Sequence, residues 1–248
     1  MRYFFEIAYN GKNYVGWQSQ INAIGVQSIV EEALSKILRE QLRIFGSSRT
    51  DAGVHCIQQF FQVDINRDFE PGQLVLRLNS FLPNDIAIQG IRKVKPGMSA
   101  RHDAIERAYR YQITQKKNPL LIGLAWHYFK VLNIDLMNEA ASTLVGEHDF
   151  ECFSKVKTDV NHFLCDIKKA DWQKKGDMLE FTIVANRFLR GMVRAIVGTL
   201  LDVGTGKTSM KEFHEIIVSR DRKKAGANVP AYGLYLTKVK YPSRIFIR

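Results

Sequence analysis

The chain has 248 residues, with 36 Lys and Arg against 25 Asp and Glu, for a formal net charge of +11. A composition that is 46% hydrophobic and 11% aromatic excludes bulk disorder, because disordered chains are poor in aromatic side chains. No apolar stretch approaches the ~20 residues that span a bilayer, and Arg2 and Glu6 interrupt the opening apolar pattern, which disfavours a signal peptide. Three cysteines (Cys56, Cys152 and Cys165) do not make a disulfide framework. We expect a soluble, cytoplasmic protein without a membrane segment.

The positive charge is concentrated in one part of the chain. Residues 1–103 carry 12 basic and 10 acidic side chains, whereas residues 104–248 carry 24 and 15, a surplus of +9. Such a surplus favours a polyanionic partner such as nucleic acid, since phosphates attract Lys and Arg. Plain solubility is the alternative, and charge alone does not decide between them. The basic runs, expected at solvated loop edges, are Lys155/Lys157, Lys168/Lys169, Lys174/Lys175 and Arg220–Lys224.

In the first half, hydrophobic periodicity predicts the order strand, helix, strand, strand, helix, strand. The first helix rests on apolar residues at i, i+3, i+4 and i+7 spacing, and Pro71 marks the start of the second. The predicted ranges are 2–9, 26–39, 42–46, 56–65, 71–80 and 86–94.

The second half repeats this order more loosely. Asp135 is the predicted N-cap of its first helix, two glycines end the next, and Ser209 with Glu212 predicts a capping box for a third. The predicted ranges are strand 105–115, helix 135–145, strands 165–173 and 178–185, helix 187–203, a helix after Ser209, and strand 232–240. We predict an α+β fold of two split-βαβ halves, with mainly antiparallel sheets and helices on one face, and domains at 1–103 and 104–248.

Two segments imitate ligand-binding motifs. Gly204–Thr208 resembles the end of a phosphate-binding loop, but Leu201 stands where the motif needs glycine, and the segment follows a helix. The spacings among His148, Cys152, His162 and Cys165 match no common zinc motif. We interpret Cys165 as a core thiol and His148–Phe150 as closing a helix-to-strand turn, and we expect no metal and no cofactor.

The most informative segment is Ser47–His55, where a strand ends in small polar residues and a tight turn follows. Arg49 and Asp51 stand two apart in that turn, with Gly53 behind them. An aspartate between apolar strands needs a partner, or it is protonated or excluded from the core. From spacing alone, the favoured interpretation is a structural Asx-turn with a surface ion pair.

Several segments nevertheless resemble one family, in family order and over nearly the whole chain. Arg49–His55 resembles the catalytic loop of the TruA family of tRNA pseudouridine synthases. The other resembling segments are Phe4–Gln18 with Val26-Gln27, Ser99–Ala104 with Tyr109–Tyr111, Phe188–Arg194 with Ile196–Gly198, and Val229–Leu236.

The resemblance implies roles for five residues. Asp51 matches the essential catalytic aspartate, as nucleophile or as base, and Tyr109 matches a tyrosine that stacks on the target base. Arg194 matches the helix arginine that pairs with the aspartate. Arg49 matches a loop arginine associated with base displacement and tRNA contact, and Leu234 matches an apolar wall of the site.

The resemblance also has departures. Ser48 stands where glycine is usual, Cys56 replaces a small residue, Arg190-Gly191 is a variant of the helix entry, and Val229 replaces alanine. We expect none of them to touch the aspartate, the tyrosine or the helix arginine, so that only the grip on tRNA is open to change.

The implied function is an isomerase (an intramolecular transferase) that converts uridine to pseudouridine in the tRNA anticodon stem-loop, at positions 38, 39 or 40. It implies tRNA as the partner, a homodimer and no cofactor. A non-catalytic RNA-binding or chaperone protein on the same scaffold is the alternative. A glycoside or nucleoside hydrolase would usually need two carboxylates, and only Asp51 lies in a convincing site.

Overall fold

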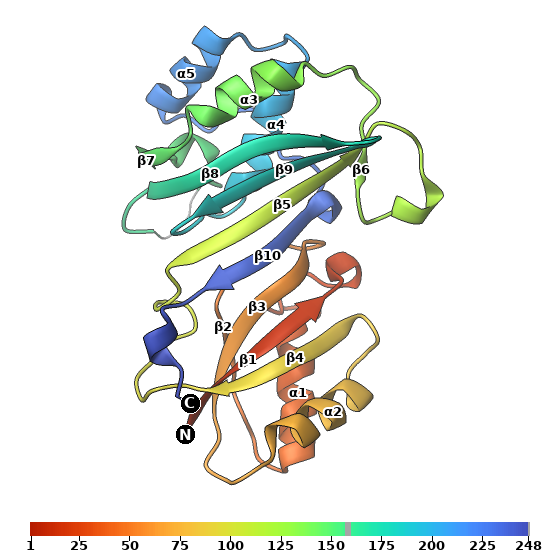
Figure 1. Cartoon of the computed structure of the whole chain (residues 1–248), viewed down its shortest axis with the longest axis vertical. Helices are drawn as coiled ribbons and strands as arrows, with labels where there is room; N and C mark the ends of the chain where they lie inside the picture. Colours follow the sequence, from red (N-terminus) through yellow and green to blue (C-terminus); the bar gives the residue numbers. More distant parts are fainter. Residues whose placement is uncertain (157–159, 248) are drawn as a thin grey trace. The chain divides into compact units, whose positions relative to one another are not determined.

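The computed structural model describes residues 1–156 and 160–247, which form two compact units (Figure 1). The first unit comprises Met1–Glu106 and Tyr235–Arg248, and the second comprises Arg107–Leu234. Lys157, from one of the basic runs, lies outside the described residues. The domain division at 103/104 stays a prediction; the compact units change at 106/107, and the C-terminal segment returns to the first.

The first unit follows the predicted β-α-β-β-α-β order, with a further strand from the C-terminal segment. Strand β1 runs antiparallel to both β3 and β4, with Phe5 opposite Phe61 and Ile91. Strands β2 and β10 both pair with β3, antiparallel and parallel respectively. The elements are β1 (Arg2–Tyr9), α1 (Val26–Leu38), β2 (Phe45–Gly46), β3 (His55–Asp64), α2 (Pro71–Phe81), β4 (Ile86–Lys93) and β10 (Leu234–Lys240).

Strand β2 is shorter than the predicted 42–46, because α1 captures the chain before it. The Ser35 Oγ accepts the Leu42 N–H at 3.0 Å, and the Glu31 Oε1 accepts the Ile44 N–H at 2.9 Å. These backbone groups therefore bind helix side chains rather than a neighbouring strand. Apolar alternation alone does not distinguish the two outcomes, since the side chains of Leu42 and Ile44 are buried in either case.

The second unit is an antiparallel sheet in the order β5-β9-β8-β7, with helices against it. Side chains of β9 alternate between buried and half-buried along its whole length, so one face is covered, and α3 packs on both β8 and α4. The predicted α+β class and mainly antiparallel sheet are confirmed. The elements are β5 (Glu106–Thr114), β6 (Trp126–His127), α3 (Ile134–Ser142), β7 (Gly146–Asp149), β8 (Leu164–Lys175), β9 (Met178–Ala185), α4 (Met192–Gly204) and α5 (Met210–Ser219).

Helix boundaries give three outcomes. The predicted N-cap Asp135 is wrong: Asn133 caps α3 by accepting the Leu136 N–H, and Asp135 lies in the first turn, where its charge still suits the helix dipole. The segment 148–150 does not only close a turn, since His148 belongs to strand β7. The capping box at Ser209 is confirmed.

Helix α4 begins five residues later than predicted. Asn186, just after β9, is still bonded to β8, because its N–H donates to the Asp166 carbonyl and its side chain accepts the Asp166 N–H. The chain then crosses to the helix through Gly191, whose φ of 73° is one that glycine adopts readily. The apolar residues of this crossing imitate a helix, and tertiary contacts decide its start. Among the described residues, no helix has the length and apolar character that crossing a bilayer requires.

Candidate active site

The Asp51 loop is tied to the first unit by main-chain hydrogen bonds from both sides. The Trp17 N–H donates to the Thr50 carbonyl at 3.2 Å, and the Gly53 N–H donates to the Tyr14 carbonyl at 3.2 Å. Asp51 itself makes an antiparallel bridge with Gly16 and is half-buried. Within the loop, the Val54 N–H donates to the Asp51 carbonyl at 3.2 Å, so main-chain hydrogen bonds from outside and from inside the loop hold this turn.

Gly16 makes this close approach possible. Its φ is +102°, and a Cβ built there would lie 2.1 Å from the Thr50 carbonyl oxygen. No other residue type fits, both for its conformation and for lack of space.

A buried polar chain supports the loop from below. The Tyr9 hydroxyl lies 2.7 Å from the Thr50 Oγ1 and accepts a hydrogen bond from the Gln59 Nε2 at 3.1 Å. Gln59 is fully buried, and the other two are nearly so. Buried polar groups that are paired in this way stabilise one arrangement, because breaking the pairing leaves an unsatisfied group. The residue beside the aspartate is therefore fixed through its side chain as well as its backbone.

Tyr109 lies in the middle of β5, opposite Ile183 of β9. Its ring meets the edge of Phe188 with centroids 5.1 Å apart and planes at 87°, the edge-to-face geometry that aromatic pairs prefer. The side chain is half-buried. Phe188 comes from the crossing segment before α4, so the late start of that helix provides the contact that orients this ring.

Arg194, in the first turn of α4, is bonded to the segment that leads into β10. Its Nε donates to the Val229 carbonyl at 2.7 Å, and the Val229 N–H donates back to the Arg194 carbonyl at 3.3 Å. The expectation that Val229 would not touch the helix arginine was wrong. The contact is through the main chain, which explains why a change of side chain at this position is compatible with it.

Tyr111, two residues beyond Tyr109, is a buried neighbour of the candidate residues to which the sequence assigned no role of its own. Its hydroxyl donates to the Pro230 carbonyl at 2.9 Å. Burial raises the pKa of Tyr111 well above its usual value, and the Arg194 charge opposes this only in part, so the phenol stays a hydrogen-bond donor. The sequence signal that could have identified Tyr111 is its place in the Tyr109–Tyr111 segment, which resembles the family. Leu234, four residues after Pro230 in the chain, is buried, as the predicted apolar wall of the site requires.

Comparison with known proteins decides the family. A sequence model described as tRNA pseudouridine synthase matches residues 7–103 and 140–242. The chain belongs to this family. The predicted family is confirmed, and with it the enzyme class, an isomerase.

Relatives in this family match over nearly their whole length. Proteins named tRNA pseudouridine synthase A are 46% identical in Porphyromonas gingivalis, over 99% of this chain and 99% of the relative, and 45% identical in Parabacteroides distasonis, over 99% and 98%. One from Thermoanaerobacter sp. (strain X514) is 38% identical, over 95% of this chain and 97% of the relative.

The structure divides the predicted family residues between the two units. Arg49 and Asp51 belong to the first, and Tyr109, Arg194 and Leu234 to the second. Arg49 is exposed, in keeping with a contact to substrate rather than a packing role. The pairing of Asp51 with Arg194 that the family resemblance implies stays a prediction.

The other departures from the family pattern also have visible surroundings. Cys56 is buried in β3, where its thiol donates to the Ile7 carbonyl across the β1 ladder at 3.8 Å. The Arg190 carbonyl accepts the Lys155 N–H, and Gly191 provides the helix entry. Neither contact involves one of the five family residues.

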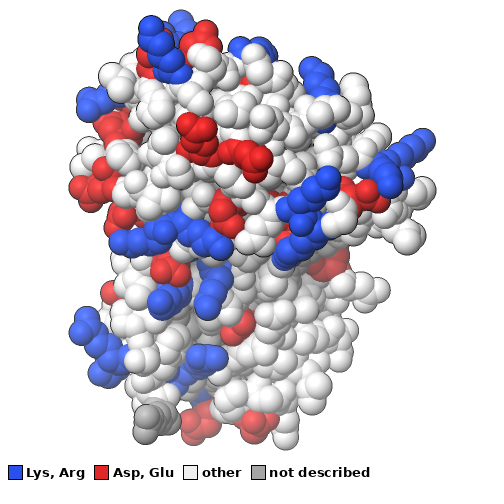
Figure 2. Space-filling view, turned by 45° about the horizontal axis from the view of Figure 1, so that its top comes forward, with Lys and Arg blue, Asp and Glu red and all other residues white. Residues whose placement is uncertain are grey.

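Basic runs on the second unit are partly neutralised where they lie. Lys168 pairs with Asp166, and the Lys169 Nζ lies 3.1 Å from the Asp171 Oδ1. Figure 2 shows acidic side chains interspersed with basic ones on the visible face, rather than one continuous basic patch.

The cysteines are buried and free, which confirms Cys165 as a core thiol of β8. Burial raises the pKa of Cys152 to about 12 and that of Cys165 to about 11. Across residues 1–156 and 160–247, no three His, Cys, Asp or Glu side chains gather closely enough to hold a metal ion.

Proposed function

We propose that this protein converts uridine to pseudouridine in the anticodon stem-loop of tRNA, at position 38, 39 or 40, with Asp51 as the reactive carboxylate. The support is a half-buried aspartate on a loop held from both sides, in a chain that its family matches across both units. A fixed reactive group is what positional catalysis requires.

The reaction rearranges bonds within one nucleotide. The N1–C1′ glycosidic bond of uridine breaks, the base turns, a C5–C1′ bond forms, and the C5 proton leaves while N1 gains one. Atoms and electrons balance without an oxidant, a reductant or water. Asp51 acts either as a nucleophile on the sugar or as the base that removes a sugar proton, and both routes need the ionised carboxylate.

In the proposed site, Arg194 pairs with the Asp51 carboxylate and orients it. Excluding water favours the neutral acid, and a nearby cation opposes this effect. A guanidinium whose Nε is already bonded to Val229 has its plane set, so its remaining N–H groups have defined directions. Removing one partner of a buried ion pair costs about 3–5 kcal/mol, since the other charge is left alone.

Tyr109 provides the platform for the displaced base. A target uridine in a stem must leave its stack before a carboxylate can reach it. Stacking on an aromatic ring contributes about 1–3 kcal/mol per base and is indifferent to base identity. The edge contact with Phe188 leaves the ring oriented before substrate arrives. Arg49 would hold the opened helix, and Leu234 would exclude water from the base.

Tritium release from tRNA labelled at uridine C5 tests the proposal. Asp51→Asn is nearly isosteric but supplies neither nucleophile nor base, so release should fall by about 10⁴-fold or more while tRNA binding persists. Asp64→Asn is the matched control, since Asp64 is an exposed partner of Arg2 at the end of β3 and should change neither quantity. Near wild-type release from Asp51→Asn would refute the assignment. A wild-type protein that binds tRNA without releasing tritium would instead be the non-catalytic scaffold protein.

Substitutions at Tyr109 separate stacking from proton movement. Tyr109→Phe keeps the ring and should retain tRNA affinity while slowing proton release in a single turnover. Tyr109→Ala should lose both, because the platform disappears. Equal behaviour of the two variants in affinity and in rate would show that the hydroxyl has no role of its own.

We also propose that the active form is a homodimer. A tRNA is larger than one protomer, and residues 104–248 carry the surplus of +9. On the face that Figure 2 draws, acidic side chains lie among the basic ones. Two copies allow one to hold the tRNA body while the other receives the anticodon arm, and binding should weaken steeply with salt.

Mixed dimers test this arrangement. One subunit carries Asp51→Asn, and the other carries Lys223→Glu and Lys224→Glu, two exposed positions of the basic run Arg220–Lys224. Activity should return in the heterodimer, since one subunit supplies the intact Lys223 and Lys224 and the other supplies the intact Asp51. A monomeric mass by light scattering, with full activity at the same concentration, would rule the dimer out.

A further inference from the structure

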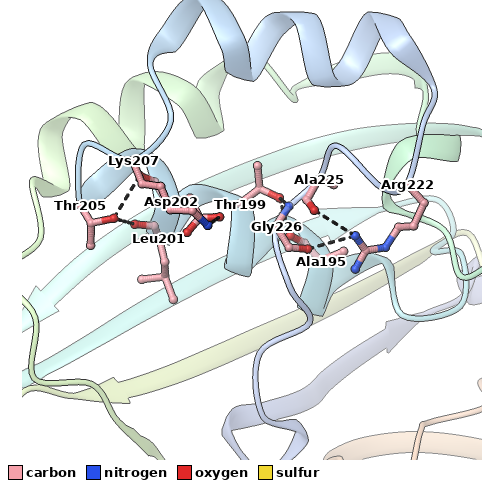
Figure 3. Close-up of polar contacts among 9 residues, drawn as sticks. All are labelled: Ala195, Thr199, Leu201, Asp202, Thr205, Lys207, Arg222, Ala225 and Gly226. Carbon is pink, nitrogen blue, oxygen red and sulfur yellow. Dashed lines mark hydrogen bonds and ion pairs between the residues drawn. The ribbon is translucent and has the colours of Figure 1, made fainter.

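The loop after α5 folds back onto the middle of α4, with two backbones in direct contact. A Cβ on Gly198 of the helix would lie 1.9 Å from the Ala227 carbonyl oxygen, and one on Gly226 of the loop would lie 2.7 Å from the Thr199 nitrogen. Figure 3 shows this segment lying against α4, with Thr199 facing Gly226. Glycines on both sides make the contact possible, and the side chains around it determine where the loop lies.

Arg222 binds this loop from within. Its Nη1 donates to the carbonyls of Ala225 and Gly226 at 3.3 and 3.0 Å, and its Nη2 donates to the Asn228 Oδ1 at 2.9 Å. In Figure 3 its side chain turns back toward the two carbonyls. Within the basic run Arg220–Lys224, Arg222 is half-buried, whereas its neighbours Lys223 and Lys224 are exposed.

Thr199 binds the same loop from the helix side. Its Oγ1 accepts the Gly226 N–H at 2.8 Å and donates to the Ala195 carbonyl at 2.8 Å. The side chain is fully buried, so both of its hydrogen-bonding roles are taken by protein groups. Loss of the hydroxyl would leave a buried N–H without this partner.

The segment 225–229, which Arg222 and Thr199 hold, ends at Val229, whose carbonyl binds the side chain of Arg194. Val229, three residues after Gly226, exchanges two hydrogen bonds with Arg194, one of them to the guanidinium Nε at 2.7 Å. Because the guanidinium is rigid and planar, the position of the Val229 carbonyl sets the direction of its outer nitrogens. A shift of the loop would therefore turn the guanidinium without altering α4.

We propose that Arg222 and Thr199 are positioning residues for the isomerisation, acting on Arg194 through the segment 225–229. The inference rests on the proposed function, because it assigns these residues to the arginine of that site. Lysine cannot replace Arg222, since one ammonium does not match three acceptors arranged around a planar fork. Serine can replace Thr199, since it keeps the hydroxyl.

The experiment uses the full-length protein and compares Arg222→Lys, Thr199→Val and Thr199→Ser. Thr205→Val is the matched control: its hydroxyl also bonds helix carbonyls, of Leu201 and Asp202, but has no bond to the 225–229 segment (Figure 3). Each variant is measured for single-turnover tritium release, tRNA dissociation constant and thermal unfolding.

We expect Arg222→Lys and Thr199→Val to release tritium about tenfold more slowly, since small misplacements of a site group are costly. Their tRNA dissociation constants should stay within about twofold of wild type, because Arg222→Lys keeps the charge and Thr199 is not exposed to RNA. Thr199→Ser and Thr205→Val should keep the wild-type rate.

The decisive comparison combines these variants with Arg194→Lys. If Arg222 acts through Arg194, adding Arg222→Lys to Arg194→Lys should slow release no further. Multiplication of the two effects, a wild-type rate for Arg222→Lys, or a rate loss in Thr199→Val that Thr199→Ser shares would each overturn the positioning role. A wild-type rate for Arg194→Lys itself would overturn the role of Arg194 and hence the positioning role. All of these results leave the proposed function intact, because that fails only if the wild-type protein releases no tritium or Asp51→Asn releases it at the wild-type rate.

Discussion

The Asp51 loop and the Arg194 segment are both fixed, but in different ways. The aspartate loop is bonded through its main chain to residues on either side, with a buried Tyr9–Thr50 hydrogen bond beneath it. Arg194 exchanges two hydrogen bonds with Val229, and the position of Val229 depends on a loop that is held by the side chains of Arg222 and Thr199. We expect the first arrangement to tolerate the loss of a single bond, and the second to pass the effect of such a loss on to Arg194.

The difference suggests that the Asp51 loop is held rigidly, whereas the Arg194 segment can adjust its position. A reacting carboxylate must lie within a fraction of an ångström of its target, which favours redundant support. An arginine that pairs with a carboxylate can follow it over a small range, so fewer contacts suffice. Because few contacts hold the Arg194 segment, we expect the position of Arg194 to be sensitive to substitutions far from the reacting atoms.

The largest expected effect comes from the glycine that admits the aspartate loop. Gly16→Ala places a methyl group 2.1 Å from the Thr50 carbonyl at a φ of +102°, so the loop must move and activity should be lost. Gly97→Ala is the matched control, because its φ is +81° and nothing lies within 4 Å of its Cβ position. The control should lose about 1 kcal/mol of unfolding free energy, and Gly16→Ala several times more, by urea denaturation.

Equal losses in the two glycine variants would mean that backbone conformation, and not the close approach to Thr50, makes Gly16 necessary. In that case the close main-chain contact between Gly16 and Thr50 would not be what holds the Asp51 loop, and the loop would not differ from the Arg194 segment in this respect.

A smaller effect is expected at Thr50. Thr50→Val removes the hydroxyl that pairs with Tyr9 and should lower the free energy of unfolding by about 1–3 kcal/mol. Single-turnover release should fall less than tenfold, because the bond from Trp17 to the Thr50 carbonyl persists. Thr50→Ser should restore both quantities. A rate loss larger than that of Thr199→Val would reverse the comparison between the regions.

Periodicity predicted the strands and helices that frame the site, because one buried face imposes a clear pattern on residues such as those of α1 and β9. It failed where backbone groups found partners that the local pattern does not encode. Leu42 and Ile44 are apolar like strand residues, yet their N–H groups bind α1. Arg187–Gly191 continue an apolar pattern, yet the last sheet contact of Asn186 delays α4.

For the candidate site, resemblance to the family supplied the five residues, and the spacing of Arg49 and Asp51 alone favoured a structural turn. What neither supplied is support from a distance in sequence. Tyr9 lies 41 residues from Thr50, and Arg222 binds a loop that contacts Arg194 through the main chain of Val229. Main-chain acceptors such as the Val229 carbonyl leave no trace in residue identity.

The smallest expected effect concerns which region opens more readily, and two buried cysteines report on it. Cys56 follows the aspartate loop in β3, and Cys152 lies in a 3-10 helix (Glu151–Phe153) that packs against α4 and α5. Buried thiols react with an alkylating reagent when the surrounding structure opens. We expect Cys152 to be alkylated faster than Cys56, measured peptide by peptide by mass spectrometry.

Arg222→Lys sharpens this measurement without relying on activity. Arg222 lies close enough for its charge to act on the Cys152 thiol, so loosening its loop should raise the alkylation rate of Cys152 severalfold and leave Cys56 unchanged. An equal rise at both cysteines would indicate global destabilisation and remove the distinction between the regions.

The pH dependence of alkylation checks that these thiols are buried in the resting protein. Burial raises the pKa of Cys152 to about 12, so the native thiol stays protonated, and the open thiolate gains population continuously as pH rises. The rate should therefore increase about tenfold per pH unit and continue past the ordinary thiol pKa of about 8.5. A plateau near that value would mean that Cys152 is exposed at rest, and that the packing of its 3-10 helix against α4 is not maintained in solution.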